Sequence, residues 1–194
     1  MPSPCHFLYR PTKRSQLHGL TLIELIVTLT VLAVLAGLAL PSFTPLLERW
    51  RTNQAISDLE STLFYARTES IRRGGGLSLI PNTTNGTCTA QANEWHCGWS
   101  LVIDSNQTAA ADTGTSPVRS ADAYSGLSLT TPANSMAIVV DRWGVMQLKQ
   151  QSGYSTVFEF TVQPSSNTTT HGQKLCIKPS GHFQKIESTS ACPA

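Results

Sequence analysis

The hydrophobic residues of this 194-residue chain begin with one long apolar run. Residues 20–40 are apolar apart from three threonines, one glycine and a single full charge, Glu24. A helix rises about 1.5 Å per residue, so this run is roughly 31 Å long and can span the hydrocarbon core of a bilayer. The pattern therefore predicts a transmembrane helix over residues 20–41.

Beyond Pro41, the apolar residues recur at helical spacing. Pro41 has no backbone N–H and is expected to bend the helix, which we predict to continue into a globular domain over residues 42–194. Arg72 and Arg73 suit the negative end of the helix dipole, and the glycines at 74–76 end the helix. The apolar stripe predicted to face a sheet consists of Phe43, Leu46, Leu47, Trp50, Ile56, Leu59, Leu63, Ala66, Ser70 and Ile71.

From residue 77 onward, short apolar stretches predict strands. Residues 105–124 form a polar loop that is either a disordered lobe or the place of one edge strand near Val118. One long helix followed by roughly six to eight short strands indicates an α+β fold, with the helix packed on antiparallel sheet. The predicted strands are residues 77–80, 95–104, 127–130, 136–141, 145–148, 157–162, 175–178 and 183–186.

Three interpretations of the N-terminal apolar run are open. A secretory signal would be cut after the run, near Ala36 or Ala39, but its apolar segment is normally shorter. A plain membrane anchor has no function for the charge of Glu24, and inserting that charge into the membrane would cost about 2.5–3.5 kcal/mol of free energy. The third interpretation is a cut before the run, after Gly19, which keeps the helix and supplies a new amino terminus as the partner of Glu24.

Residues 19–24 (GLTLIE) resemble the class III signal of type IV prepilins and type II secretion pseudopilins. The resemblance implies that a prepilin peptidase cuts after Gly19 and methylates the new amine of Leu20. It also implies that Glu24 neutralises the amine of a neighbouring subunit. Leu20 stands where the family usually has phenylalanine, whereas Pro41 matches the family pattern.

The same resemblance implies an organisation and a location. It implies a prepilin leader peptide over residues 1–19, a transmembrane assembly helix over 20–41 and a pilin-like periplasmic domain over 42–194. One span would hold the protein in the bacterial inner membrane, and assembly into a pilus would bring it to the cell surface. Its partners would be the prepilin peptidase and other pilins or pseudopilins of the same fibre.

Three short patterns in the strand region resemble the GspH/FimT branch of this family. They are residues 97–104 (CGWSLVID), 139–144 (VVDRWG) and 175–181 (LCIKPSG). The resemblance implies a minor pilin or pseudopilin, a structural subunit of a type IV pilus or a type II secretion pseudopilus that helps assemble a tip or priming complex. The alternative is a DNA-binding minor pilin for DNA uptake in natural transformation.

The formal net charge of +2 comes from the leader. Arg10, Lys13 and Arg14 lie in it without any acidic residue, which favours retention on the cytoplasmic side. Once these three are removed, eleven basic residues face twelve acidic ones, so the mature chain is close to neutral. A neutral domain has no global field to attract nucleic acid, and any DNA contact must come from a local patch.

The last predicted hairpin is the candidate for such a patch. In DNA-binding pilins of the FimT type the matching turn reads G-R-x-R, and its arginines hold DNA phosphates, whereas residues 181–185 read GHFQK here. The remaining candidate cations are Lys178, His182 and Lys185. Because phosphate binding requires several fixed cations, DNA is the less favoured partner.

Four cysteines remain after Cys5 leaves with the leader. An even number in an exported domain indicates disulfides formed in an oxidising periplasm. Four cysteines allow three pairings, and we predict the two local ones, Cys88–Cys97 and Cys176–Cys192, against the alternative of four reduced thiols. No C-x-x-C or H-x-x-x-H spacing supports a zinc site.

The sequence contains no catalytic motif of the G-x-S-x-G, H-E-x-x-H or Walker type. We therefore expect no enzyme activity, cofactor, metal or small-molecule substrate. Residues 104–106 hint at a calcium loop, but the glycine and glutamate that such a loop requires are missing, which favours a solvated turn. Trp95 and Trp99 could stack on bases or on a partner, but alternate strand positions favour a place in the core.

Overall fold

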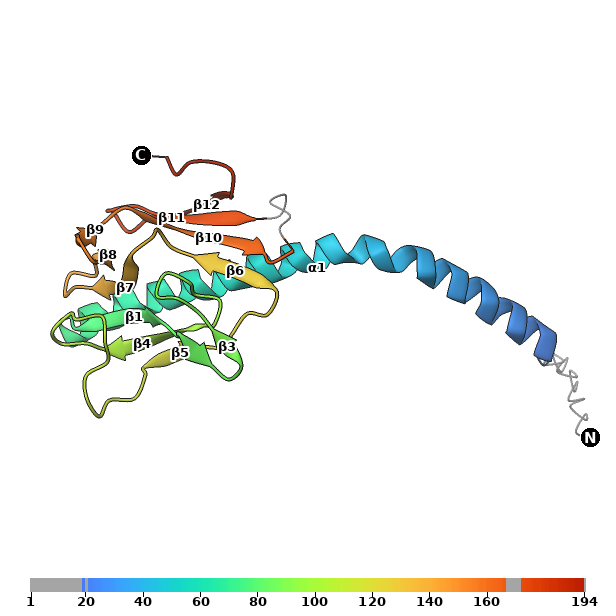
Figure 1. The fold of residues 1–194 in the computed structure, drawn as a ribbon, viewed down its shortest axis with the longest axis horizontal. Coiled ribbons are helices and arrows are strands. Elements are labelled where there is room, and N and C mark those ends of the chain that lie inside the picture. Colours follow the sequence, from blue (N-terminus) through green and yellow to red (C-terminus); the bar gives the residue numbers. More distant parts are fainter. Residues whose placement is uncertain (1–18, 20, 167–171, 194) are drawn as a thin grey trace, which may run out of the picture. The chain divides into compact units, whose positions relative to one another are not determined.

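The computed structural model describes residues 19, 21–166 and 172–193. The chain divides into two compact units, Met1–Ser42 and Phe43–Ala194. Helix α1 runs from Leu22 to Arg73 and contributes residues to both units (Figure 1). The predicted long helix is therefore confirmed, and it is 52 residues long.

Helix α1 ends at the predicted glycines. Arg73 is its last residue, and Gly74, Gly75 and Gly76 have φ angles of 82°, 105° and 74°. The Gly75 N–H donates to the Ser70 carbonyl at 2.8 Å and so satisfies one of the carbonyls left without a partner at the helix end. Glycine reaches positive φ without steric cost, which explains why the chain turns here.

Twelve short strands follow α1 in the described part of the chain, and the paired strands are antiparallel. One sheet has the order β5-β4-β1-β7-β8-β9 and a second has the order β12-β11-β10-β6, while β2 and β3 form a separate hairpin (Figure 1). This arrangement confirms the predicted α+β class. The strands are β1 (Leu77–Pro81), β2 (Thr84–Asn85), β3 (Cys88–Thr89), β4 (Trp99–Ile103), β5 (Arg119–Ala121), β6 (Leu127–Thr130), β7 (Ser135–Val140), β8 (Met146–Gln150), β9 (Gly153–Ser155), β10 (Phe158–Pro164), β11 (Gln173–Ile177) and β12 (Phe183–Glu187).

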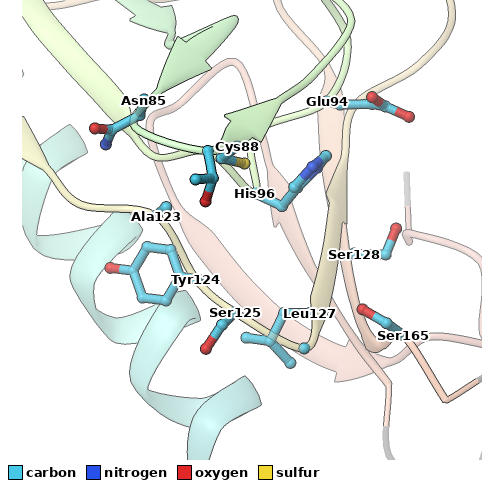
Figure 2. A pocket seen from close by; sticks show the side chains of 12 residues that line it. Asn85, Cys88, Glu94, His96, Ala123, Tyr124, Ser125, Leu127, Ser128 and Ser165 are labelled. Atoms are coloured by element: carbon cyan, nitrogen blue, oxygen red, sulfur yellow. The ribbon is translucent and has the colours of Figure 1, made fainter.

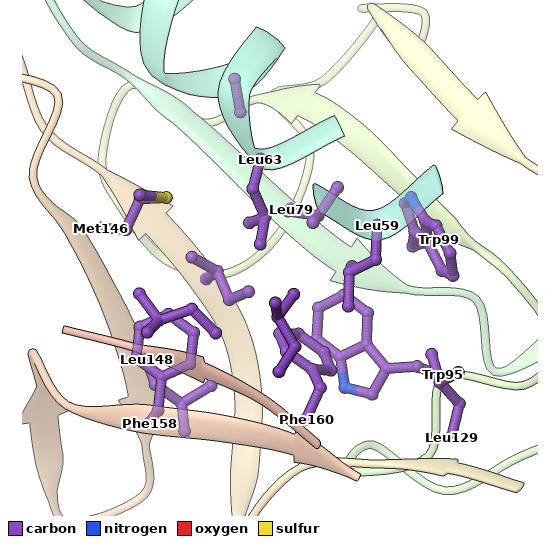
Figure 3. Close-up of a cluster of buried hydrophobic side chains, with 14 of the residues drawn as sticks. Leu59, Leu63, Leu79, Trp95, Trp99, Leu129, Met146, Leu148, Phe158 and Phe160 are labelled. Atoms are coloured by element: carbon purple, nitrogen blue, oxygen red, sulfur yellow. The ribbon is translucent and has the colours of Figure 1, made fainter. Parts of the chain in front are cut away.

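Both large sheets share one hydrophobic core with α1 (Figure 3). Trp95 packs edge-to-face on Phe160, with the ring centroids 5.0 Å apart. The indole N–H groups are satisfied inside this core: Trp95 donates to Thr131 Oγ1 at 3.2 Å and Trp99 donates to Thr62 Oγ1 at 3.3 Å. Both tryptophans are fully buried, which confirms their predicted place in the core.

The predicted apolar stripe of α1 is buried only in its second part. The fully buried members are Ile56, Leu59, Leu63, Ala66 and Ser70. The members that are 52–62 % exposed are Phe43, Leu46, Leu47, Trp50 and Ile71. The prediction that the whole stripe faces a sheet was wrong. Among the described side chains of α1, the domain buries none before Thr52, and Ile71 near the end of the helix is exposed as well.

The predicted strand over residues 95–104 is shorter in the structure. Only β4 is extended, because Gly98, with a φ of 86°, makes a turn in which its N–H donates to the Trp95 carbonyl at 3.0 Å. Within residues 105–124, β5 pairs with β4, so the edge-strand alternative is correct. The sequence pattern does not predict β2, β3 and β9, which are only two or three residues long.

Candidate functional site

The predicted cleavage and assembly residues lie around the first turn of α1. Gly19 and Glu24 are exposed, and Leu20 lies outside the described residues. Thr21 caps the helix, since its Oγ1 accepts the Glu24 N–H at 3.3 Å. Residues 21–24 (TLIE) have the spacing of a capping box, a signal that could have identified Thr21 from the sequence.

The first part of α1 carries large apolar side chains of its own that are exposed. From Leu22 to Leu35, ten of them are 47–76 % exposed. Glu24 lies in the first turn, where the positive end of the helix dipole favours a carboxylate, and it forms no ion pair with any other described residue. Taken over the residues that the structure describes, none of the helices combines the length and apolarity that crossing a membrane demands.

The candidate DNA-binding residues are arranged around the turn between β11 and β12. Lys178 and His182 close this turn through the backbone, because the Lys178 N–H donates to the His182 carbonyl at 3.1 Å. Lys185 points elsewhere: its Nζ lies 2.6 Å from Oε2 of Glu60 on α1. The structure thus brings two of the three candidate residues to one turn and engages the third in an ion pair.

Both predicted disulfides are present. Cys88 is bonded to Cys97 with a Cα–Cα distance of 5.6 Å, and Cys176 is bonded to Cys192 with a distance of 5.7 Å. The second bond ties the C-terminal tail to β11. His96 and Glu159 each lie beside one of these pairs, but bonded sulfur atoms offer no thiolate to a metal ion.

The buried carboxylate of Asp104 has a structural explanation. Its oxygens accept hydrogen bonds from Ser78 Oγ at 2.6 Å, the Thr108 N–H at 2.8 Å and the Ala109 N–H at 2.9 Å. Burial alone raises the pKa of Asp104, but these hydrogen bonds outweigh it and hold the pKa below its usual value. The carboxylate therefore anchors the following loop to β1, and its oxygens face donors rather than a calcium ion.

A surface hollow of about 430 Å³ separates the β2–β3 hairpin from the segment that leads into β6 (Figure 2). One wall is Tyr124, whose hydroxyl donates to Asp58 Oδ2 at 2.9 Å and whose ring stacks on Trp99. Burial, together with the hydrogen bond to Asp58, raises the pKa of the Tyr124 hydroxyl well above its usual value, so it stays protonated. Glu94 and His96 also line the hollow, and Glu94 Oε2 accepts the Gln91 N–H at 2.8 Å.

Comparison with protein families yields two matches. Residues 55–181 match the family described as Type II transport protein GspH. Residues 14–40 match the Prokaryotic N-terminal methylation motif, and they include the GLTLIE signal with Gly19 and Glu24. The first match covers more than half of the chain and contains most of the sheet domain.

Similar known proteins are pilins. The Pilin-like protein PilA1 of Thermus thermophilus is 36 % identical over 96 residues, 50 % of this chain and 54 % of that protein, so the match spans about half of the relative. Two crystal structures of the type IV minor pilin FimU of Pseudomonas aeruginosa, in two different space groups, have TM-scores of 0.52 and 0.50. They cover 74 % and 72 % of this chain and 94 % and 96 % of the FimU chains at 18 % identity, a likeness of fold.

Proposed function

The chain belongs to the family of the Type II transport protein GspH, and we propose that it is a minor pilin or pseudopilin that α1 builds into a pilus-like fibre. The observation that carries this proposal is the first part of α1, where exposed apolar side chains from Leu22 to Leu35 lie within the match to the N-terminal methylation motif. Covering such surface contributes about 25 cal/mol per Å², so packing against the helices of other subunits is favourable.

In this proposal a prepilin peptidase cuts after Gly19 and methylates the amine of Leu20. Gly19 is exposed, and no atom of another described residue, its chain neighbours aside, lies within 4 Å of the position that a Cβ would take there. The chain itself can therefore accommodate a larger residue at position 19. A block in processing on such a substitution would report the requirement of the peptidase rather than a folding defect.

Glu24 is proposed to neutralise the new amine of a neighbouring subunit. Placing a carboxylate at the centre of a membrane costs about 2.5–3.5 kcal/mol of free energy, and placing an unpaired charged amine there is unfavourable for the same reason. Bringing the two charges together removes both costs at once. The cap by Thr21 supports this role, because it fixes the first turn of α1 and with it the position of the carboxylate.

The proposed location follows from the same segment. Residues 20–41 would lie in the inner membrane before assembly, with the domain over residues 42–194 in the periplasm. The two disulfides support an oxidising compartment for this domain. The FimU-like fold supports a minor subunit, and we propose that it acts in a tip or priming complex of a type IV pilus or a type II secretion pseudopilus.

The test is assembly in cells that also express the other fibre subunits. We expect Glu24→Ala to be cut normally but to enter fibres poorly, and Glu48→Ala, a control on the same helix, to assemble normally. Gly19→Val should accumulate as a full-length precursor. Normal incorporation of Glu24→Ala, or a mature chain that begins at a residue other than Leu20 by mass spectrometry, would contradict the proposal.

DNA capture is the second candidate, and its residues at the β11–β12 turn are the half-buried Lys178 and the exposed His182. Lys185 adds little to it, because Glu60 already neutralises its charge. Each cation that is withdrawn from a phosphate-binding patch reduces affinity and its dependence on salt. We therefore favour the structural role over a role in DNA uptake.

A further inference from the structure

The turn between β7 and β8 presents an exposed tryptophan on a rigid support. Trp143 is 75 % exposed, more than any other described aromatic side chain. Asp141 Oδ1 accepts the N–H groups of Trp143 at 2.8 Å and Val145 at 2.9 Å, and the Gly144 N–H donates to the Asp141 carbonyl at 3.0 Å. Because these bonds already order the backbone, a ligand of Trp143 loses little free energy in ordering the turn.

The end of α1 holds the same turn from the other side. The buried Ser70 Oγ donates to the carbonyls of residues 140 and 141 at 3.0 and 2.8 Å. A Cβ on Gly144 would lie 2.8 Å from Arg67 Cγ and 2.9 Å from Ile71 Cδ1, so both side chains pack directly on this glycine. The β7–β8 turn and the C-terminal end of α1 therefore form one fixed surface.

We name this surface the turn face and define it as Arg67, Ile71, Arg142 and Trp143. Ile71 is 53 % exposed, and Arg142 is exposed. In the described part of the chain, neither arginine of the turn face has an ion-pair partner. The turn face thus combines an exposed apolar anchor with the exposed guanidinium group of Arg142, whereas the half-buried Arg67 places its guanidinium group against Gly181.

Two neighbouring arginines, Arg72 and Arg73, add only one net positive charge, because both pair with the single carboxylate of Glu69. Glu69 accepts hydrogen bonds from Arg72 Nε at 2.7 Å and from Arg73 Nε at 2.5 Å, and its ion pairs occupy both guanidinium groups. The positive charge available to a ligand is therefore small and local. It matches one or two carboxylates better than the backbone of a nucleic acid, where affinity comes from many phosphate contacts.

We propose that the turn face is a docking site for an acidic segment of a protein partner. Tryptophan and arginine are the residues most often found to dominate the energy of protein interfaces. A guanidinium group also binds a carboxylate through two parallel hydrogen bonds, which fixes the orientation of the partner. The site leaves the first part of α1 untouched, so it adds a contact beyond fibre packing.

The test uses the full mature chain, purified in detergent and immobilised, with a phage-displayed library of random twelve-residue peptides as the probe. We expect the enriched peptides to combine Asp or Glu with an aromatic or long aliphatic residue. One enriched peptide is then synthesised with a fluorescent label, and its dissociation constant is measured by anisotropy.

Point variants locate the binding site of that peptide. Trp143→Ala should weaken binding about 30-fold or more, as for the dominant residues of an interface. Arg142→Gln should weaken it about tenfold, and Arg142→Lys should restore only part of the loss because it lacks the planar fork. Trp50→Ala is the matched control and should bind normally, since Trp50 is also a highly exposed indole, at 62 %, but does not belong to the turn face.

Three results would overturn the proposal. They are enrichment of peptides without acidic residues, unchanged binding by Trp143→Ala, and binding of a single-stranded 20-nucleotide DNA through Trp143 and Arg142 without any acidic peptide. Circular dichroism confirms that each variant is folded. Because the fibre-assembly test depends on Glu24 instead, either proposal can fail while the other stands.

Discussion

The two parts of α1 differ in where their apolar side chains go. In residues 22–35 and 43–50, the large apolar side chains are about half to three-quarters exposed, whereas Leu59 and Leu63 are fully buried in the core shared with the sheets. Both parts have good helical patterns in the sequence. The difference is that the second part has its partner within the same domain, and the first part does not.

This contrast shows what the apolar pattern of a helix means. In the second part, apolar residues on one face match the sheets, and polar residues such as Asp58 and Glu60 lie on the other faces. From Leu22 to Leu35, apolar residues lie on every face, which is typical of a helix that lipid or other helices surround. The pattern thus separates the face for folding from the surface for assembly.

The largest expected effect comes from breaking the buried part. Leu59→Ala should lower the free energy of unfolding by about 2–5 kcal/mol, because it removes a fully buried side chain and leaves a cavity. Leu46→Ala, at a position that is 62 % exposed, should stay within about 0.5 kcal/mol of the unaltered chain. Urea denaturation measures both, and similar losses for the two variants would contradict the division of α1.

A smaller effect is expected where the end of α1 is attached to β7. Ser70→Ala removes the buried hydroxyl that donates to two backbone carbonyls, and it should destabilise the domain by about 1–3 kcal/mol. Ser61→Ala is the control, because the hydroxyl of Ser61 makes exposed bonds only: it donates to the Asp58 carbonyl within the same helix and accepts from Arg119 Nη2 at 3.3 Å. Equal unfolding midpoints for the two variants would count against the attachment.

Stability in acid should report the ion pairs at the same helix end. Hydrogen bonds from Arg72 and then Arg73 lower the pKa of Glu69 from 4.5 to about 2. A lowered pKa stabilises the folded state above the unfolded value, so this contribution is complete above about pH 4.5 and disappears as the pH falls toward 2. Glu69→Gln should remove this part of the pH dependence in chemical denaturation, and an unaltered profile would show that the pairs do not stabilise the domain.

The smallest effect is expected at the ion pair between Lys185 and α1. Both side chains are partly exposed, so Lys185→Ala should cost at most about 1 kcal/mol. If Glu60 keeps Lys185 from DNA, the variant should also leave duplex DNA binding by the purified chain unchanged at low salt. A complex that is lost on Lys185→Ala, measured by gel shift, would favour the DNA-uptake alternative.

Local signals in the sequence were sufficient for much of the fold. The glycines at 74–76 ended α1, the period-two stretches located the longer strands, and the nearest cysteines paired. Thr21 was also within reach, because the capping box depends only on residues three apart. Strands β2, β3 and β9 could not be predicted, since two or three residues cannot display a period.

The sequence by itself determined the features that depend on neighbouring residues along the chain. They include the methylation motif, the long helix and its end, and the α+β class, because short-range sterics and periodicity control them. Tertiary structure alone decided that the sheets bury α1 only from Thr52 onward, that Lys185 meets Glu60, and that Ile71 packs on Gly144, the residue after the exposed Trp143. These contacts join residues far apart in the chain, and the order of the strands in the sheets, which no local pattern encodes, brings them together.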